Sequence, residues 1–233
     1  MSRKTLFALL VLLLIVLAPF TVLPALLESA TARILQDQLG LQETPEVDIE
    51  SSPAPMMYAG SFSKALVSAK GIDLAGVKTE NVAMDLDPFN LNLLESVTSG
   101  EVSTEQPLSG KMSAALSEEN VSRLAQVGSG VPVQGVGLED DKVVLEMSLG
   151  FGGAVSVRGR LFLQNGLLIF QPEQIEGAPS FVSTEQLLAL TRFSYPVTGL
   201  PFGAKVTGVD VRKDHLTLSG EIQKIPLEGI PAG

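Results

Sequence analysis

Cysteine and tryptophan are absent from the sequence, and histidine occurs once in 233 residues. Without cysteine the chain can form no disulfide bond, no zinc–thiolate or iron–sulfur site and no cysteine nucleophile. A single histidine excludes metal sites built from several imidazoles and leaves a hydroxyl nucleophile without its commonest general base. We therefore expect a protein that is not an enzyme and that holds neither a metal ion nor another cofactor.

Basic residues are also scarce, with 16 Lys and Arg against 26 Asp and Glu and a formal net charge of -10. Because affinity for nucleic acids rests on basic patches that neutralise phosphates, this balance excludes a nucleic-acid partner. Hydrophobic residues make up 45% of the chain and charged residues 18%, so the chain can bury a sizeable core and is not globally disordered.

The N-terminus carries a long uncharged run. Arg3 and Lys4 precede residues 5–27, whose 23 positions would span roughly 34 Å as a helix, enough to cross a bilayer. Positive charge before the run predicts that the rest of the chain lies outside the cytoplasm. Residues 1–32 are thus a membrane anchor or, with a small-x-small site at 30–32, a cleaved signal peptide. In both cases we expect residues 33–230 to form a single exported domain, anchored to the cell membrane or secreted to the cell envelope.

The exported part is acidic, so any contact with lipid must be apolar and local. Removing residues 1–32 leaves 14 basic and 25 acidic residues, a net charge of -11, which argues against adhesion to anionic headgroups. Pro55-Met56-Met57-Tyr58, with Phe62 close by, can supply an apolar contact, because flexible Met beside an aromatic ring forms adaptable surfaces. The alternative is a loop packed on the core.

Strand-like alternation dominates the exported part. Apolar and polar residues alternate over 82–86, 143–149 and 155–163, and Asn165-Gly166 predicts a type I′ hairpin turn. The chain closes with a predicted hairpin of residues 206–211 and 216–222.

Helices are predicted to be few and short. One covers residues 27–40, a second follows Ser117 as its N-cap, and a third begins at Thr184, where Ser183 and Gln186 match a capping box. Together the pattern is typical of an α+β fold with a large antiparallel sheet, which must curl at this length. One face of the sheet must be covered by helices or by ligand.

Several motifs are better explained by structure than by chemistry. His215 beside Asp214 is predicted to lie in a surface turn. Residues 139–141 lack the oxygen spacing of a calcium loop and predict a solvated hairpin turn. The glycine-rich residues 128–130 and 150–153 do not match nucleotide-binding spacings, and the sequon at Asn120 falls inside a predicted helix.

Three stretches of the sequence resemble the LmeA-type phospholipid-binding family. The first joins Gly60-Ser61-Phe62, Val67-Ser68-Ala69-Lys70-Gly71-Ile72 and Leu74-Ala75-Gly76-Val77; the second joins Leu86-Asp87, Leu93-Leu94, Ser99-Gly100-Glu101-Val102 and Leu116-Ser117-Glu118-Glu119-Asn120-Val121; the third joins Leu200-Pro201-Phe202-Gly203-Ala204-Lys205-Val206-Thr207-Gly208-Val209 and Leu218-Ser219-Gly220. The resemblance covers about residues 33–227.

This resemblance implies a tubular lipid-binding half-barrel, in which a curved, twisted antiparallel sheet wraps around a few helices and leaves an apolar groove. It further implies an envelope protein whose partners are phospholipid and the membrane, with a role in lipid transfer or in maturation of an envelope glycolipid. Each acyl chain buried in such a groove would gain about 0.8 kcal/mol per methylene.

Strand alternation and the positions of bulky residues predict which side chains line the groove. We expect Leu187 and Leu190 on the third helix to face the interior, and the phenylalanines at element ends to lie where the groove opens. The predicted lining and mouth residues are Met57, Phe62, Met84, Leu86, Phe89, Leu161, Leu163, Leu187, Leu190, Phe193 and Phe202.

Two other functions fit the sequence less directly. The many Asp and Glu residues are compatible with an exported hydrolase that acts on envelope lipid or glycan through a pair of carboxylates. A structural envelope module without a ligand would fill its groove with its own side chains.

Overall fold

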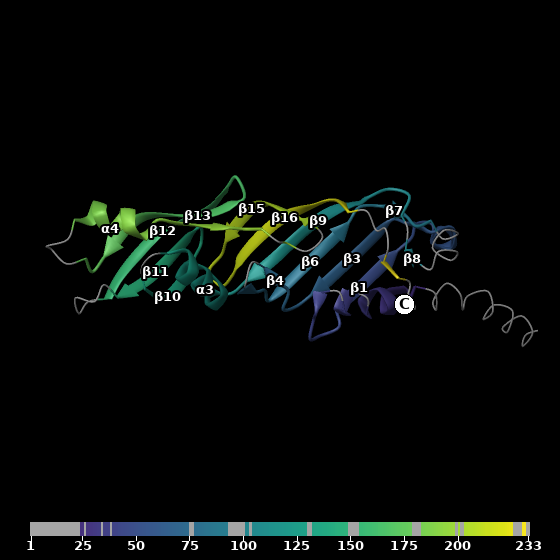
Figure 1. The fold of residues 1–233 in the computed structure, drawn as a ribbon, viewed down its shortest axis with the longest axis horizontal. Coiled ribbons are helices and arrows are strands. Elements are labelled where there is room, and N and C mark those ends of the chain that lie inside the picture. The colour runs from purple at the N-terminus through teal and green to yellow at the C-terminus, as the bar shows by residue number, and fades with distance from the viewer. Residues whose placement is uncertain are drawn as a thin grey trace, which may run out of the picture. The chain divides into compact units, whose positions relative to one another are not determined.

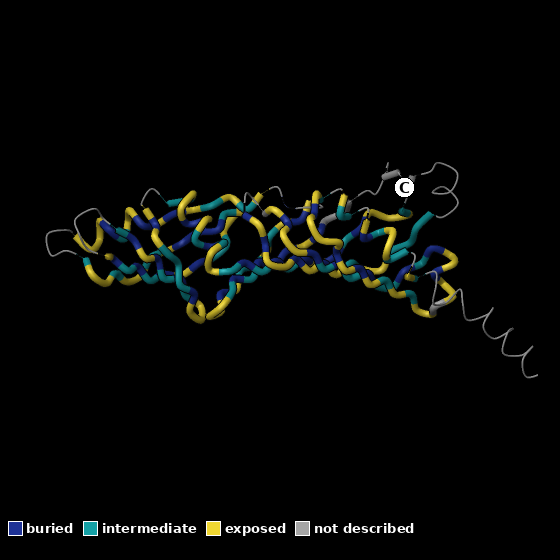
Figure 2. The backbone as a smooth tube through the Cα atoms, turned by 90° about the horizontal axis from the view of Figure 1, so that it is seen from below, coloured by how far each residue is buried: buried dark blue, intermediate teal, exposed yellow. Residues whose placement is uncertain are grey.

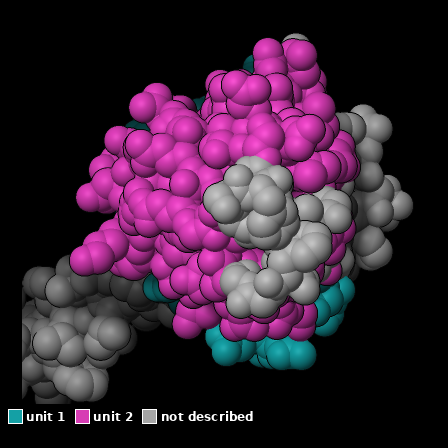
Figure 3. Space-filling view, turned by 90° about the vertical axis from the view of Figure 1, so that its left-hand side faces the viewer, with its two compact units in different colours: residues 1–68, 85–108, 224–233 teal, residues 69–84, 109–223 magenta. Residues whose placement is uncertain are grey.

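The computed structural model of the chain describes residues 24–25, 27–33, 35–37, 39–74, 77–92, 101–102, 104–129, 132–148, 154–178, 183–198, 200, 203–225 and 230–231. These residues belong to two compact units (Figure 3). The first takes residues 1–68, 85–108 and 224–233, and the second takes residues 69–84 and 109–223. Within the described ranges, no helix has the length and apolarity needed to span a membrane. The predicted anchor or signal segment lies largely outside these ranges.

The first unit is built from a helix, a turn of 3-10 helix and short antiparallel pairs. Strand β1 (Glu46–Glu50) pairs with β3 (Lys64–Ala69), β2 (Ser61–Phe62) with β7 (Phe89–Asn90), and β8 (Glu101–Val102) with β17 (Ile230–Pro231). The 3-10 helix η1 covers Ala54–Ala59. Residues 27–33 and 35–37 are helical, as predicted, and the Glu28 carboxylate accepts a hydrogen bond from the Ile49 backbone at 3.3 Å. That bond ties the helix to β1.

The second unit contains a five-stranded antiparallel sheet in the order β10-β11-β12-β13-β14 (Figure 1). Its strands are β10 (Val133–Glu139), β11 (Lys142–Ser148), β12 (Ala154–Gln164), β13 (Leu167–Glu176) and β14 (Phe193–Pro196). Asn165 and Gly166 join β12 to β13 with φ angles of 53° and 74°. Both angles are positive, as a type I′ turn requires, so the turn predicted from the Asn-Gly pair is confirmed.

Further strands complete the second unit. Strands β6 (Asn81–Leu86), β9 (Leu108–Leu116), β16 (Leu216–Ile225) and β15 (Lys205–Val211) lie side by side in that order. The last two form the predicted closing hairpin. Strand β3 ends at Ala69, and a small hairpin of β4 (Asp73–Leu74) and β5 (Val77–Lys78) follows a positive-φ turn at Gly71.

Two helices of the second unit begin in different ways. Helix α3 (Glu118–Gly128) starts at Ser117, whose hydroxyl accepts a hydrogen bond from the Asn120 backbone, which confirms the predicted N-cap. Helix α4 (Thr184–Thr191) starts after Ser183, but the Ser183 side chain forms no capping bond. The predicted capping box is therefore wrong: Ser183 and Gln186 are both exposed, where water can satisfy the same groups.

Burial follows strand alternation closely. Figure 2 shows buried and less buried residues succeeding each other along the strands. On β6 the buried residues are Val82 and Met84, and on β11 they are Val143, Leu145 and Met147. The fold is thus of the predicted α+β class, dominated by antiparallel strands.

Candidate functional site

The inward face of the five-stranded sheet is apolar on all five strands. Because side chains alternate along a strand, each strand places every second residue on this face. The nearly fully buried members are Val133, Leu138, Val143, Leu145, Met147, Val155, Val157, Leu161, Leu168, Phe170 and Phe193. Register confirms their alignment, since Leu145 lies opposite Val157 and Leu161 lies opposite Phe170.

Helix α3 lies against this face, and the sheet curls around the helix. The helix contacts β10 and β14, which are the two edge strands of the sheet. A single helix can contact both edges only if the sheet bends around it. Its buried side chains are Val121, Leu124 and Ala125. The sheet and helix therefore form a half-barrel with an apolar interior, as predicted.

Hydrogen bonds hold α3 beside β10. Glu118 accepts a hydrogen bond from the Leu138 backbone at 2.9 Å, and the Gln126 amide donates to the Val133 carbonyl at 3.3 Å. These contacts lie at the two ends of the helix, so α3 runs along the strand. Near its C-terminus, Val127 is 75% exposed.

Close packing marks the other side of the interior. The rings of Phe170 and Phe193 are stacked with centroids 5.3 Å apart. A Cβ atom on Gly128 would lie 3.0 Å from the Phe193 ring, so the C-terminal end of α3 approaches β14 as closely as a glycine allows. The sequence prediction included Phe193 but missed Phe170 and Gly128. The sequence signal for this contact was the apolar run of residues 167–170, which contains Phe170 but not Gly128.

Seven predicted residues belong to the second unit, and the structure does not bury all of them. Met84, Leu161, Leu187 and Phe193 are at most 8% exposed. Leu163 is half-buried on the inward side of β12, opposite Leu168.

Leu190, also in the second unit, is 62% exposed, so the expectation that it shares the interior with Leu187 is wrong. Helix α4 has only two turns, and it buries the stripe formed by Leu187 and Thr191. Phe202 lies outside the described residues.

The remaining predicted residues belong to the first unit. Phe62 and Phe89 are opposite each other in the β2–β7 pair, and their rings stack with centroids 5.1 Å apart. Phe62 is 3% exposed, whereas Phe89 and Leu86 are half-buried. Met57, in η1, is 7% exposed. The structure thus brings two of the predicted phenylalanines, Phe62 and Phe89, into direct contact.

Helix η1 presents an apolar surface beside this aromatic pair. Met56 and Tyr58 are 44% and 46% exposed, and residues 51–63 contain no charged side chain. Gly60 ends the helix with a φ of 78° and donates its backbone N–H to Met57, while its carbonyl accepts from Leu91 at 2.7 Å. These bonds tie the end of η1 to Leu91, the residue that follows β7. Exposed Met and Tyr side chains in an uncharged segment suit contact with the boundary between water and lipid.

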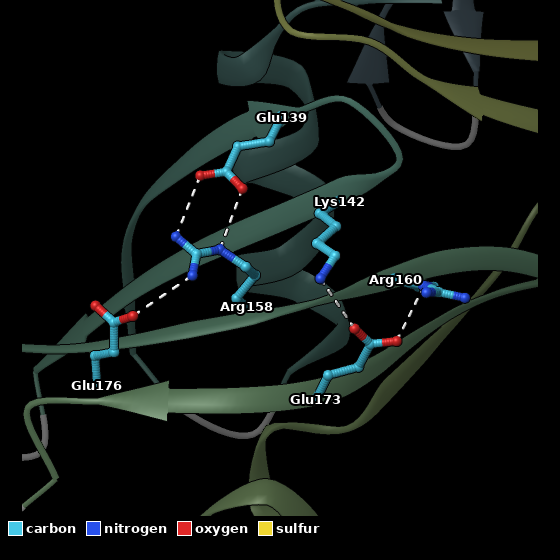
Figure 4. Close-up of polar contacts among 6 residues, drawn as sticks. All are labelled: Glu139, Lys142, Arg158, Arg160, Glu173 and Glu176. Atoms are coloured by element: carbon cyan, nitrogen blue, oxygen red, sulfur yellow. Dashed lines mark hydrogen bonds and ion pairs between the residues drawn. The ribbon is translucent and has the colours of Figure 1, made fainter.

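The outward face of the sheet is polar and paired. Arg158 lies between two carboxylates, with Glu139 at 3.1 Å and Glu176 at 3.5 Å (Figure 4). The turn of residues 140–141 that joins β10 to β11 is exposed, and Asp141 has a φ of 63°. The predicted solvated hairpin turn is therefore confirmed.

The single histidine lies in the β15–β16 turn, as predicted. Its Nδ1 is 2.6 Å from the Asp214 carboxylate, and this hydrogen bond lowers the pKa of Asp214 below its usual value. Asp214 is exposed and His215 is half-buried in this turn, which follows the exposed residues Arg212 and Lys213. Across the ranges that the structure describes, no group of three or more His, Asp or Glu side chains could hold a metal ion.

Comparison with known proteins gives one match. The family model described as LmeA-like phospholipid-binding matches residues 21–221, which include both compact units in large part. No curated protein and no solved structure matches the chain. The match covers most of the sequence and agrees with the family resemblance carried by the three stretches above. The chain belongs to the LmeA-like phospholipid-binding family.

Proposed function

We propose that the protein is exported and holds the acyl chains of a phospholipid in an apolar groove, as a carrier or presenter of envelope lipid. The observation that carries the proposal is the apolar inward face of the half-barrel, which extends over all five strands. In a member of a phospholipid-binding family, such a face is a natural surface for acyl chains. The role is binding rather than catalysis.

The energetics favour hydrocarbon over water at this face. Each methylene removed from water contributes about 0.8 kcal/mol, so two long chains supply a large driving force. Helix α3 covers the face with the small or medium side chains Val121, Leu124 and Ala125. A change in how α3 lies on the sheet would give an acyl chain access to Leu145, Val157 and Leu161.

The first unit supplies a second set of lipid contacts in this proposal. Phe62 and Phe89 form the aromatic pair, and η1, which carries Met57 and the exposed Met56 and Tyr58, contacts β2 beside it. Leu86, which ends β6 and belongs to the same unit, is a further predicted contact. Since the exported chain is acidic, this uncharged segment is the part best suited to enter the boundary of a membrane. The N-terminal run of residues 5–27 would keep the protein at the membrane or direct its export.

Native mass spectrometry tests lipid binding directly. The full-length protein is expressed with its N-terminal segment, purified from membranes in a mild detergent, and its bound lipid is extracted and identified. We expect phospholipid to be retained after detergent exchange. A delipidated, folded protein that binds no liposomes would contradict the proposal.

A matched pair of variants tests the location of the lipid. Leu161 faces the interior and Phe162 faces the opposite side of β12. Leu161→Phe adds bulk inside the half-barrel, so we expect lower lipid occupancy with a cooperative thermal transition retained. Phe162→Leu changes a comparable volume on the outward face and leaves occupancy unchanged. Equal occupancy in both variants would place the acyl chains elsewhere.

A further inference from the structure

A separate hollow lies along β12, β13 and the β10–β11 turn in the second unit. It has a volume of about 600 Å³ and is lined by Asp141, Arg160, Leu161, Phe162, Gln171 and Glu173. Pockets for small molecules measure about 300–1,000 Å³ and combine an apolar surface with a few polar groups. The hollow has this size and this mixture of side chains.

A β-bulge sets the surroundings of Arg160, the cation that lines the hollow. Lys142 on β11 lies opposite Arg160 on β12, because Val143 is opposite Gly159. Across β13 the register shifts between Arg158 and Gly159, which leaves Glu173 as the extra residue. Its two carboxylate oxygens lie 3.4 Å from Lys142 Nζ and 3.0 Å from Arg160 Nε (Figure 4). Glu173 therefore neutralises part of both cations and orients the guanidinium of Arg160.

Arg160 remains open to a ligand despite this contact. Its side chain is 64% exposed, compared with 32% for Arg158, which is held between two carboxylates. Figure 4 shows the guanidinium extending past Glu173 on the side away from Lys142. Glu173 approaches the guanidinium at Nε, at its inner end, and most of the side chain is exposed. A guanidinium held in this way can donate two parallel hydrogen bonds to a phosphate.

Asp141 supplies the opposite charge. Its backbone N–H donates to the Val211 carbonyl at 3.1 Å, which holds the turn in place, and its side chain is exposed. Among the described residues, the Asp141 carboxylate takes part in none of the ion pairs. The nearby cation Arg212 is engaged by Asp210 at 2.7 Å. The Asp141 carboxylate is thus available to accept hydrogen bonds from an ammonium group.

The charge balance of the hollow selects the class of ligand. Among the lining residues, Arg160 contributes one positive charge, and Glu173 and Asp141 contribute two negative ones. Lys142 lies outside the lining and offsets the charge of Glu173 from β11. A simple anion would be repelled by the carboxylates, and a simple cation by the guanidinium and ammonium. A ligand with both charges complements this lining, and the half-buried Phe162 adds an apolar surface.

We propose that this hollow binds a zwitterionic phosphoethanolamine group, with its phosphate on Arg160 and its ammonium on Asp141. The group belongs to a phospholipid at a membrane surface or to a free glycerophosphodiester. The site goes beyond the acyl-chain interior, because Arg160 and the interior residue Val157 point to opposite faces of β12, and Leu161 borders both.

Isothermal titration of the full-length protein in a non-ionic detergent tests the site. The probe is sn-glycero-3-phosphoethanolamine, with sn-glycerol 3-phosphate and ethanolamine as the singly functional comparators. We expect the probe to bind about tenfold more tightly than either comparator, because each charge-assisted contact contributes about one power of ten. Equal binding of glycerol 3-phosphate would overturn the zwitterionic site.

Three variants locate the site. Arg160→Gln and Asp141→Asn should each weaken probe binding about tenfold. Asn tolerates the positive φ of position 141, so the turn is retained. Arg158→Gln is the matched control, since Arg158 lies on the same face but outside the hollow, and it should bind as the wild type does. If all three variants bind alike, the proposal is wrong.

Vesicles distinguish the two sources of the group and separate this site from the acyl-chain interior. Binding to vesicles of phosphatidylethanolamine and phosphatidylcholine that weakens in Arg160→Gln supports a membrane lipid, whereas a defect confined to the soluble probe supports the free diester. Acyl-lipid occupancy, measured by native mass spectrometry, should be equal in Arg160→Gln and wild type. If the wild type carries no acyl lipid but still binds the probe, the proposed function is wrong and the phosphoethanolamine site is not affected.

Discussion

Gly159 and Phe170 occupy neighbouring strands of the half-barrel, and the ring of Phe170 fills the space that a side chain at position 159 would need. A Cβ atom on Gly159 would lie 2.7 Å from Phe170 Cζ and 2.4 Å from the backbone oxygen of Gln171. The ring can shift only by disturbing its stack with Phe193. The missing side chain is therefore part of the packing of the half-barrel interior.

Gly159→Ala should lower the free energy of unfolding by about 1–3 kcal/mol, the usual range for overpacking in a filled core. The control is Gly137→Ala on β10, where the new Cβ would lie 3.8 Å from Val144 Cβ, an ordinary contact. Urea denaturation of both variants measures the difference. The control should be neutral or slightly stabilising, since alanine reduces the entropy of the unfolded chain. Equal stabilities would mean that β12 and β13 can separate to admit the methyl group.

Helix α4 offers two leucines with opposite expected behaviour. Leu187 is 4% exposed, so Leu187→Ser should destabilise the protein by about 3 kcal/mol through a cavity and a buried hydroxyl. Leu190→Ser should change stability by less than about 0.5 kcal/mol, because that residue is exposed. If Leu190 contacts lipid, vesicle binding per folded molecule should still fall in Leu190→Ser. Unchanged vesicle binding would remove Leu190 from the lipid-contact residues.

Features encoded by adjacent residues were predictable from the sequence. The Asn165-Gly166 turn and the Ser117 cap depend on backbone angles and hydrogen bonds within four residues, so tertiary packing had little influence on them. Alternation likewise identified the buried residues Val143, Leu145 and Met147, because a half-buried strand has a period of two. These local signals were sufficient to predict the α+β class and the antiparallel sheet.

Features that depend on register were not predictable. The bulge at Glu173 and the contact of Gly159 with Phe170 arise from how β12 and β13 align, and single-strand patterns contain no such information. The exposure of Leu190 depends on which stripe of α4 packs against β13. The aromatic pair of Phe62 and Phe89 required knowledge that two distant two-residue strands meet.

Serine variants of the aromatic pair in the first unit test whether Phe62 and Phe89 support the fold or contact lipid. Phe62→Ser should lower the melting temperature by several degrees, because its ring is 3% exposed. Phe89 is half-buried, so Phe89→Ser should cost less stability and should slow transfer of fluorescent phospholipid between vesicles. Thermal melts and a transfer assay normalised to folded protein measure the two effects. If both variants melt much lower but transfer lipid normally, the two phenylalanines are core residues and their proposed lipid contact is wrong.

The pair of Asp214 and His215 predicts a local effect of pH. The hydrogen bond from the His215 imidazole, which requires a proton on Nδ1, lowers the pKa of the Asp214 carboxyl from its ordinary 3.8. A lowered pKa in the folded state means that ionised Asp214 favours folding. This contribution is complete above the unfolded pKa and is lost as pH falls through the lowered folded value.

His215→Ala removes the hydrogen-bond donor, so the pKa of Asp214 should rise toward its ordinary value. Carboxyl carbon chemical shifts followed by NMR between neutral and acidic pH measure this change. Lys213→Ala is a control in the same turn that leaves the hydrogen bond intact. An unchanged titration of Asp214 in His215→Ala would show that the turn backbone, rather than the imidazole, is responsible.

The carboxylate of Glu173 separates two like charges, and its removal should have a salt-dependent cost. In Glu173→Gln, Lys142 and Arg160 remain opposite each other on adjacent strands without the anion between them. We expect a loss of about 1 kcal/mol or less, because all three side chains are partly exposed and solvent screens them. The loss should shrink as salt is raised from 0.05 to 0.5 M in denaturation experiments, since the Debye length falls below about 5 Å. Glu176→Gln provides the control, because it leaves Arg158 paired with Glu139 and creates no pair of facing cations. A larger loss that does not depend on salt would indicate that Glu173 acts through the geometry of the bulge instead of through its charge.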